Sequence, residues 1–213
     1  MALKSEWVSK LFKTLLIAFI VLRTVDFIAV ISYTPNFDVS LTYLFSRYEF
    51  MNNVYFMNHI TVIIVFVIWI YRVHMDLNAL FPRYTRSPGM ALACVTIPLF
   101  NFYGIPSNFL RIGSHFQTES SRTLREGQWV SGLAVPQLIV IFFANPVTQY
   151  AVRVEANESL IVVVAFMNLL ITVIYLILTV LISQGLSIVS ANRTEIVYPS
   201  EVTIPGEQTP PMN

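Results

Sequence analysis

The amino-acid sequence predicts an all-α fold, a polytopic membrane helical bundle, on three observations. Hydrophobic residues make up 55% of the 213 residues and charged residues only 12%, with a mean hydropathy of +0.65, whereas a soluble domain carries about 25% charged residues. Four stretches are apolar and long enough to cross a bilayer core of about 30 Å, which takes about 20 helical residues. A fifth apolar stretch is broken by prolines. We therefore expect four transmembrane helices and one additional helical hairpin.

The four expected transmembrane helices cover residues 11–32, 54–73, 129–147 and 159–183. The last of them contains no charged residue. The first contains Arg23 and Asp26, each of which costs about 2.5 to 3.5 kcal/mol at a helix centre, against about −0.3 to −0.6 kcal/mol for each Leu, Ile, Val or Phe. The cost of inserting the two charges and the gain from the apolar residues nearly cancel, so this helix is only marginally stable in a membrane by itself. We therefore expect the two charges, one turn apart, to pair with each other.

The fifth stretch, residues 90–110, contains Pro98, Gly104 and Pro106. Each proline removes a backbone donor and kinks a helix, so a smooth crossing is not expected. A re-entrant or interfacial helical hairpin accommodates such a sequence where neighbouring helices or water satisfy the freed carbonyls. We predict a hairpin that does not cross the membrane.

The basic residues predict an orientation. If the hairpin does not cross, only Arg47 and Arg153 among the lysines and arginines of the loops and tail lie on the outer side, and both termini are cytoplasmic. The tryptophans, Trp7, Trp69 and Trp129, then fall at cytoplasmic helix ends, where an indole prefers the headgroup level.

A change of composition divides the chain near residue 192. From there prolines recur among Ser, Thr, Glu and Gln, with little apolar surface to offset the ordering of the chain. We expect a membrane domain over residues 1–191 and a disordered cytoplasmic tail over residues 192–213.

Several classes of protein are not favoured. A net charge of +1 does not suit a nucleic-acid binder, which needs a clustered basic excess. No Walker loop, HExxH, GxSxG or EF-hand pattern occurs. The three histidines have no neighbouring His or Cys, and Cys94 is the only cysteine. We expect no catalytic, cofactor-binding or metal site, no cofactor and no enzymatic activity.

An intramembrane polar cluster of Arg23, Asp26 and His59 is the first candidate site, because ionisable groups within a membrane are costly. Counted inward from the outer ends of the first two helices, Asp26 lies about seven residues deep and His59 about five, a difference of about 3 Å. The cluster predicts either a proton relay or ion site, with His59 titrating near neutral pH, or a structural pair that locks the two helices together.

A second pattern lies on the predicted cytoplasmic side. It comprises Trp69, Tyr71, Arg72, Leu77, Ser87, Pro88, Gly89, Pro98 and Asn101. It resembles a family of bacterial membrane proteins, domain of unknown function 4328, whose core reads W-x-[WY]-R-x-x-x-N-L, then S-P-G, then P-x-x-N. This chain departs from that core at Asp76, where the family has Asn, and Pro106 lies one residue late. The resemblance covers about residues 54–185, implies a bacterial inner or internal membrane, and assigns no activity.

The same stretch has a physical interpretation. Arg72 and Asp76 are spaced i, i+4, and either could bond carbonyls freed by Pro98 and so fasten the hairpin. Alternatively, a basic cytoplasmic rim binds anionic lipid headgroups. The rim would consist of Arg72, Arg83, Arg86 and Arg111.

These patterns lead to two hypotheses of function. The leading hypothesis is a non-enzymatic accessory or assembly partner of a membrane complex, with other membrane proteins or further copies of the chain as partners. The alternative is a small ion or proton channel or transporter that uses Arg23, Asp26 and His59.

Overall fold

The structure is a computed structural model, and it describes residues 3–33, 37–119, 121–153 and 158–197. These ranges hold α-helices and one short 3-10 turn, η1, and no strand. The elements are α1 (Glu6–Tyr33), α2 (Phe37–Leu80), α3 (Pro88–Thr96), α4 (Pro98–Glu119), η1 (Ser121–Thr123), α5 (Leu124–Arg153) and α6 (Glu158–Val197). The predicted all-α bundle is confirmed.

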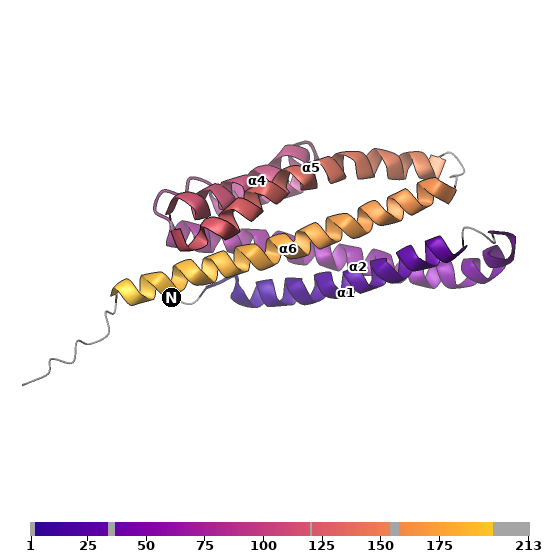
Figure 1. The fold of residues 1–213 in the computed structure, drawn as a ribbon, viewed down its shortest axis with the longest axis horizontal. Helices are drawn as coiled ribbons and strands as arrows, with labels where there is room; N and C mark the ends of the chain where they lie inside the picture. Colours follow the sequence, from indigo (N-terminus) through magenta and orange to yellow (C-terminus); the bar gives the residue numbers. More distant parts are fainter. Residues whose placement is uncertain (1–2, 34–36, 120, 154–157, 198–213) are drawn as a thin grey trace, which may run out of the picture.

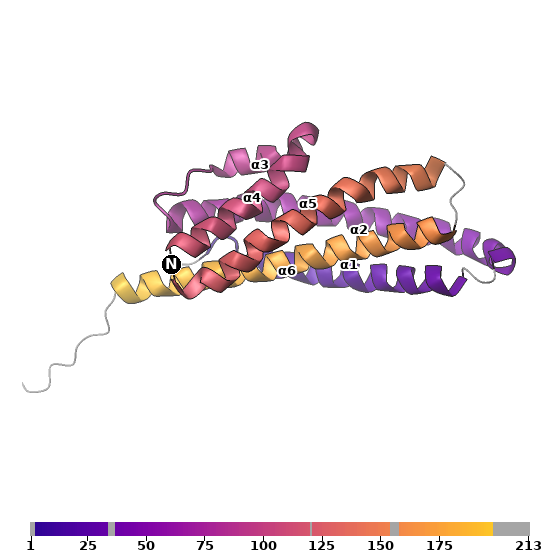
Figure 2. The ribbon, with the colours of Figure 1, turned by 45° about the horizontal axis from the view of Figure 1, so that its top comes forward.

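The long helices lie along one axis, so the molecule is elongated (Figures 1 and 2). The start of α1 and the end of α6 lie at the same end of this axis. We call the half of the bundle at that end the proximal half, which comprises residues 3–19, 65–140 and 172–197, and the opposite half the distal half. The α3–α4 hairpin begins and ends at the proximal end of the bundle. It connects α2 to α5 in space, because α3 packs on α2 and α4 packs on α5 (Figure 2).

Among the described residues, four helices are long and apolar enough to cross a membrane. They are Glu6–Ile31, Phe56–Leu80, Ser121–Thr148 and Leu160–Arg193. The four stretches predicted to span are therefore helical and long enough to cross a membrane, and each of these helices is longer than its apolar stretch. A helical backbone satisfies its own hydrogen bonds, so it continues past the last apolar residue until a capping or breaking signal stops it.

The predicted boundary at residue 192 is wrong, because α6 continues to Val197. Asn192 accepts a hydrogen bond from the guanidinium of Arg122 in η1, which holds this last part of the helix against the bundle. The rest of the predicted tail, residues 198–213, lies outside the described residues.

The hairpin has a clear local cause. Ser87 caps α3, with its Oγ accepting from the amide of Met90 at 3.2 Å, and Pro88 occupies the first helical position. At nine residues, α3 is about 14 Å long, too short to cross a bilayer. The backbone breaks at Ile97, directly before α4 begins at Pro98. Pro106, which was expected to break this stretch as well, lies inside the uninterrupted α4.

Small residues let α4 pack closely on both neighbours. A Cβ at Gly104 would lie 2.4 Å from the carbonyl oxygen of Cys94 in α3, and one at Gly113 would lie 2.7 Å from the carbonyl oxygen of Gly127 in α5. Gln117 then donates to that same Gly127 carbonyl at 3.0 Å. Direct backbone contact of this kind is typical of helix pairs in membranes.

The core occupies the proximal half. Its largest fully buried side chains belong to Trp69, Phe12, Phe109, Phe116, Leu16, Ile70, Leu77, Leu80, Ile112, Leu178, Ile182 and Leu186. In the distal half, among the residues whose side chains the structure describes, only Ala165 is buried. The two halves therefore differ sharply in how tightly their side chains pack.

Candidate functional sites in the two halves of the bundle

Asp76, near the end of α2, binds the beginning of α1. Its carboxylate accepts from the amide of Lys4 at 3.0 Å and from that of Ser5 at 2.8 Å, and it is almost fully buried. A carboxylate at a helix N-terminus satisfies free amides and favours the positive end of the helix dipole. Asp76 thus fastens α1, and the expectation that it bonds to the hairpin is wrong.

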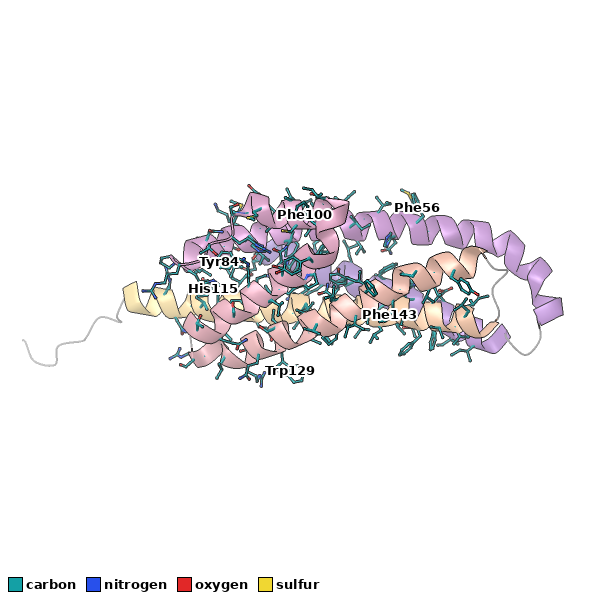
Figure 3. All side chains as sticks on the ribbon, turned by 90° about the horizontal axis from the view of Figure 1, so that it is seen from above. Phe56, Tyr84, Phe100, His115, Trp129 and Phe143 are labelled. Carbon is teal, nitrogen blue, oxygen red and sulfur yellow. The ribbon has the colours of Figure 1, made fainter. Side chains whose placement is uncertain are left out.

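Trp69 joins the same two helices. Its indole Nε1 donates to Ser9 Oγ at 2.9 Å, and the side chain is completely buried against Phe12, with ring centroids 5.3 Å apart. The expected position at the headgroup level is therefore wrong for Trp69. Trp7 and Trp129 are exposed, as expected, and Figure 3 shows Trp129 on the outside of the bundle.

Arg86 is the residue that holds the hairpin. Its guanidinium donates to Asn108 Oδ1 and, at 3.1 Å, to Ser107 Oγ in α4. The side chain of Asn108 also donates to the carbonyl of Ala91 in α3, at 3.2 Å. Arg86 is only 5% exposed, so it does not belong to an exposed lipid-binding rim. Hydrogen bonds to neutral oxygens compensate its burial, and no described carboxylate pairs with it.

Next to Arg86, the rings of His74 and His115 pack on either side of Tyr84, with centroid distances of 5.7 and 4.8 Å. Figure 3 shows Tyr84 and His115 close together near the proximal end. His74 Nδ1 bonds the carbonyl of Ile70, whereas His74 Nε2, Tyr84 Oη and His115 Nδ1 are buried without a hydrogen-bond partner. Burial raises the pKa of Tyr84 well above its ordinary value, so its hydroxyl stays protonated.

The distal half holds the predicted intramembrane cluster. Arg23 acts electrostatically on both Asp26 and His59, and its guanidinium lies over the ring of Phe19, 4.9 Å from the centroid. That ring in turn packs against His59, at 6.2 Å. Arg23 is therefore close to both of the other predicted residues: to Asp26, one turn away on α1, and to His59 across the ring of Phe19. His59 is exposed, and Arg23 and Asp26 are partly exposed.

An apolar layer separates this cluster from the proximal histidines. His59 and His74 are about 22 Å apart along α2, at 1.5 Å per residue. Between them lie Phe66, Trp69 and Ile70, all buried, and Phe12 of α1 packs on the first two with ring centroids 5.8 and 5.3 Å away. The described residues of this layer fill the space between α1 and α2 with rings and aliphatic side chains.

The remaining members of the motif are structural or exposed. Ser87, Pro88 and Gly89 form the start of α3, and Gly89 has open space around it. Tyr71 and Arg72 are exposed on α2. Pro98 begins α4 and Asn101 follows on its first turn, but the side chains of both lie outside the described residues. The other rim residues, Arg83 and Arg111, are exposed, and Arg111 donates to Thr85 Oγ1 at 3.3 Å.

Sequence reasoning missed Asn108, Tyr84, His115 and Ser9. Each is a common residue in a helix or loop, and its role depends on a partner far along the chain, such as the 22 residues between Arg86 and Asn108. The signal that could have pointed to them is the unusual presence of Arg86 directly before a helix start, since a cation there needs acceptors.

The fold and these sites define a helical protein with four potential membrane spans. Within the described residues, no three side chains of the His, Cys, Asp and Glu types are grouped to hold a metal ion. No protein-family model, no curated protein and no solved structure matches the chain. The resemblance to domain of unknown function 4328 therefore stays a prediction.

Proposed function

We propose that the chain is a non-enzymatic membrane protein that acts as an accessory or assembly partner within a larger membrane complex. One observation carries this proposal: the ionisable cluster of Arg23, Asp26 and His59 lies in the distal half, where almost no described side chain is buried.

Membrane depth makes that cluster costly in isolation. Arg23 lies about 12 Å inside the Ile31 end of its span, at 1.5 Å per residue, where a charge is unfavourable unless protein or water surrounds it. Arg23 and Asp26 are partly exposed and His59 is exposed, so all three side chains reach the surface of the bundle. Helices of a partner protein with polar side chains would complete this environment.

The proximal half supports the same proposal by contrast. There, buried polar groups join one helix to another: Asp76 and Trp69 to α1, Arg86 to α4, and Gln117 to α5. These hydrogen bonds connect the helices of this half directly to one another. The distal half is then the part of the chain that is open to further helices.

Site-specific photo-crosslinking in native membranes tests the proposal. A photoreactive residue in place of Val25, which is 54% exposed in the distal half, should give crosslinks to protein. The matched control is Val135, which is 53% exposed on proximal α5 and should give lipid adducts only. Lipid adducts alone at both positions, or equal protein crosslinks at both, would contradict the proposal.

The second candidate is an ion or proton path, favoured by the action of Arg23 on both Asp26 and His59. The apolar layer around Trp69 argues against such a path, because the conduction of ions or protons needs water or polar groups along the whole path. Proton flux into proteoliposomes should therefore stay at the level of empty liposomes. Flux that is abolished by both Asp26→Asn and His59→Gln would favour the path instead.

The orientation and the lipid contacts are part of the same proposal. With the termini in the cytoplasm, the proximal end faces the cytoplasmic leaflet, and Arg72, Arg83 and Arg111 form an exposed basic rim toward anionic headgroups. On the resemblance stated above, the membrane is a bacterial inner or internal one. Protease protection of an epitope placed after residue 197 in inverted and right-side-out vesicles would test this orientation.

A further inference from the structure

A groove with both polar and apolar lining lies between the beginning of α1 and the end of α6, in the proximal half. Its volume is about 300 Å³, and its polar lining includes Glu6, Lys10, Lys13, Ser183, Gln184 and Ser187. The groove borders the contact between α1 and α2, because Ser5 and Ser9, which bond Asp76 and Trp69, also line it. Its other polar residues take no part in the clusters described above.

The groove presents more donors than its own residues use. Lys10 Nζ donates to Glu6 Oε1 at 2.8 Å, which neutralises that pair. Among the described residues, no carboxylate pairs with Lys13, and neither the amide of Gln184 nor the hydroxyl of Ser187 has an intramolecular hydrogen bond. An ammonium, an amide and a hydroxyl on facing helices are suited to an anion with several acceptor oxygens.

The position of the groove suits a headgroup. Lys13 lies about 10 Å inside the Glu6 end of its span, at 1.5 Å per residue, where a cation is unfavourable unless an anionic group, protein or water surrounds it. Its flexible side chain can extend toward the interface.

An apolar stripe continues from Lys13 toward the bilayer centre. Ile17 and Val21 follow Lys13 at i+4 and i+8, so all three lie on one face of α1. They are 53% and 58% exposed, and therefore free to contact an acyl chain. A groove with a positive charge and hydrogen-bond donors, at one end of an exposed apolar stripe, has the two parts that a phospholipid needs.

We propose that this groove binds the phosphate headgroup of an anionic phospholipid, with Lys13 as the cation, Gln184 and Ser187 as hydrogen-bond donors, and the acyl chain along Ile17 and Val21. The site is separate from the rim of Arg72, Arg83 and Arg111. It does not depend on the proposed assembly function, since it faces lipid at the other half of the bundle.

Native mass spectrometry of the purified intact chain, titrated with phosphatidylglycerol or phosphatidylcholine, tests the proposal. Phosphatidylglycerol should bind more tightly, and Lys13→Gln should weaken its binding about fivefold, the effect of about one cation near an anionic headgroup. Lys13→Arg should retain binding. Glu6→Gln should strengthen binding, because it removes a carboxylate and releases Lys10.

Arg125→Gln is the matched control, as it removes an exposed cation of the proximal half that belongs neither to the groove nor to the basic rim. An unchanged affinity in Lys13→Gln, or equal losses in Lys13→Gln and Arg125→Gln, would overturn the proposal. So would equal binding of both lipids. Millimolar inorganic phosphate should not displace the lipid; if it binds the groove and phosphatidylglycerol does not, the ligand is a soluble phosphate and the lipid assignment is wrong. A thermal unfolding midpoint equal to that of the wild type verifies that each variant is folded.

Discussion

At the scale of single residues, the molecule uses buried polar side chains as links between helices. Asp76 is the clearest case, since one carboxylate serves two backbone amides of another helix. An amide that loses its acceptor inside a protein costs more than the hydrogen bond contributed in the first place.

Asp76→Ala should therefore lower the free energy of unfolding by about 1 to 3 kcal/mol for the amides left unpaired, with more where the helix dipole adds to the loss. Chemical denaturation in detergent micelles, followed by circular dichroism, measures it. Arg72→Ala, one turn earlier on α2 and exposed, should change stability by less than about 0.5 kcal/mol. Equal effects of the two substitutions would refute the assigned role of Asp76.

Arg86 allows a sharper test, because its partners are neutral. Asn108→Ala leaves a buried guanidinium with one acceptor fewer and should destabilise the fold by about 3 kcal/mol. The double variant Arg86→Leu with Asn108→Leu removes both groups and should be less destabilised than the sum of its single variants. A double-mutant cycle of unfolding free energies measures this coupling, and additive effects would contradict it.

At the scale of the helices, close backbone contact decides how α4 packs on α5. A Cβ at Gly113 would lie 2.2 Å from Ser131 Oγ and 2.8 Å from the Ser131 amide, whereas a Cβ at Gly132 meets nothing within 4 Å. The two glycines thus provide a matched pair for the same substitution.

Gly113→Ala should lower stability by about 1 to 3 kcal/mol, because the helices must separate to admit the methyl group. Gly132→Ala should raise it by up to about 1 kcal/mol through the better helix propensity of alanine. Thermal unfolding of both variants in the same detergent measures the difference. Destabilisation of the same size in both would mean that the contact between α4 and α5 does not set the packing.

The helices themselves could be predicted from the sequence, because hydropathy over about 20 residues reports directly on membrane crossing. Their ends could not. α6 runs on past residue 192 because Asn192 bonds Arg122, a residue 70 positions away. The break in the hairpin was predicted at Pro98 and Pro106, yet only Pro98 marks one, since a proline is tolerated inside a helix when its neighbours adapt.

A candidate site could be predicted from the sequence where it depends on how deep its residues lie within the expected membrane spans. Counting along two antiparallel helices predicted a cluster of Arg23, Asp26 and His59, and in the structure Arg23 is close to each of the other two. Arg86 was expected at the surface and is buried, because a charge near a membrane boundary has the same sequence signature whether it faces lipid or another helix. Which of the two applies depends on tertiary partners that hydropathy does not encode.

At the scale of the whole molecule, the two halves should differ in mobility. The proximal half contains nearly all of the buried described side chains, and regions with few buried contacts open at lower free energy. This contrast can be measured on the isolated chain.

Distances between spin labels at Val25 and Phe143, both distal, should be broadly distributed, and those between labels at Leu11 and Leu124, both proximal, narrowly. Double electron–electron resonance in lipid nanodiscs, in a Cys94→Ser background, measures both pairs. All four labelled positions are exposed, so the labels themselves should not disturb packing. Equally narrow distributions would show that the distal half is as rigid as the proximal one without any partner.

The bond between Asp76 and the start of α1 also bears on how the chain is made. The carboxylate follows Lys4 by 72 residues, so the ribosome must synthesise all of α2 before α1 acquires its anchor. The charges of Arg23 and Asp26 meanwhile leave α1 with little tendency to stay in the bilayer alone. If the chain is inserted into a membrane as proposed, α1 and α2 should therefore enter the bilayer together as one antiparallel pair, and synthesis of Asp76 should complete the contact between them.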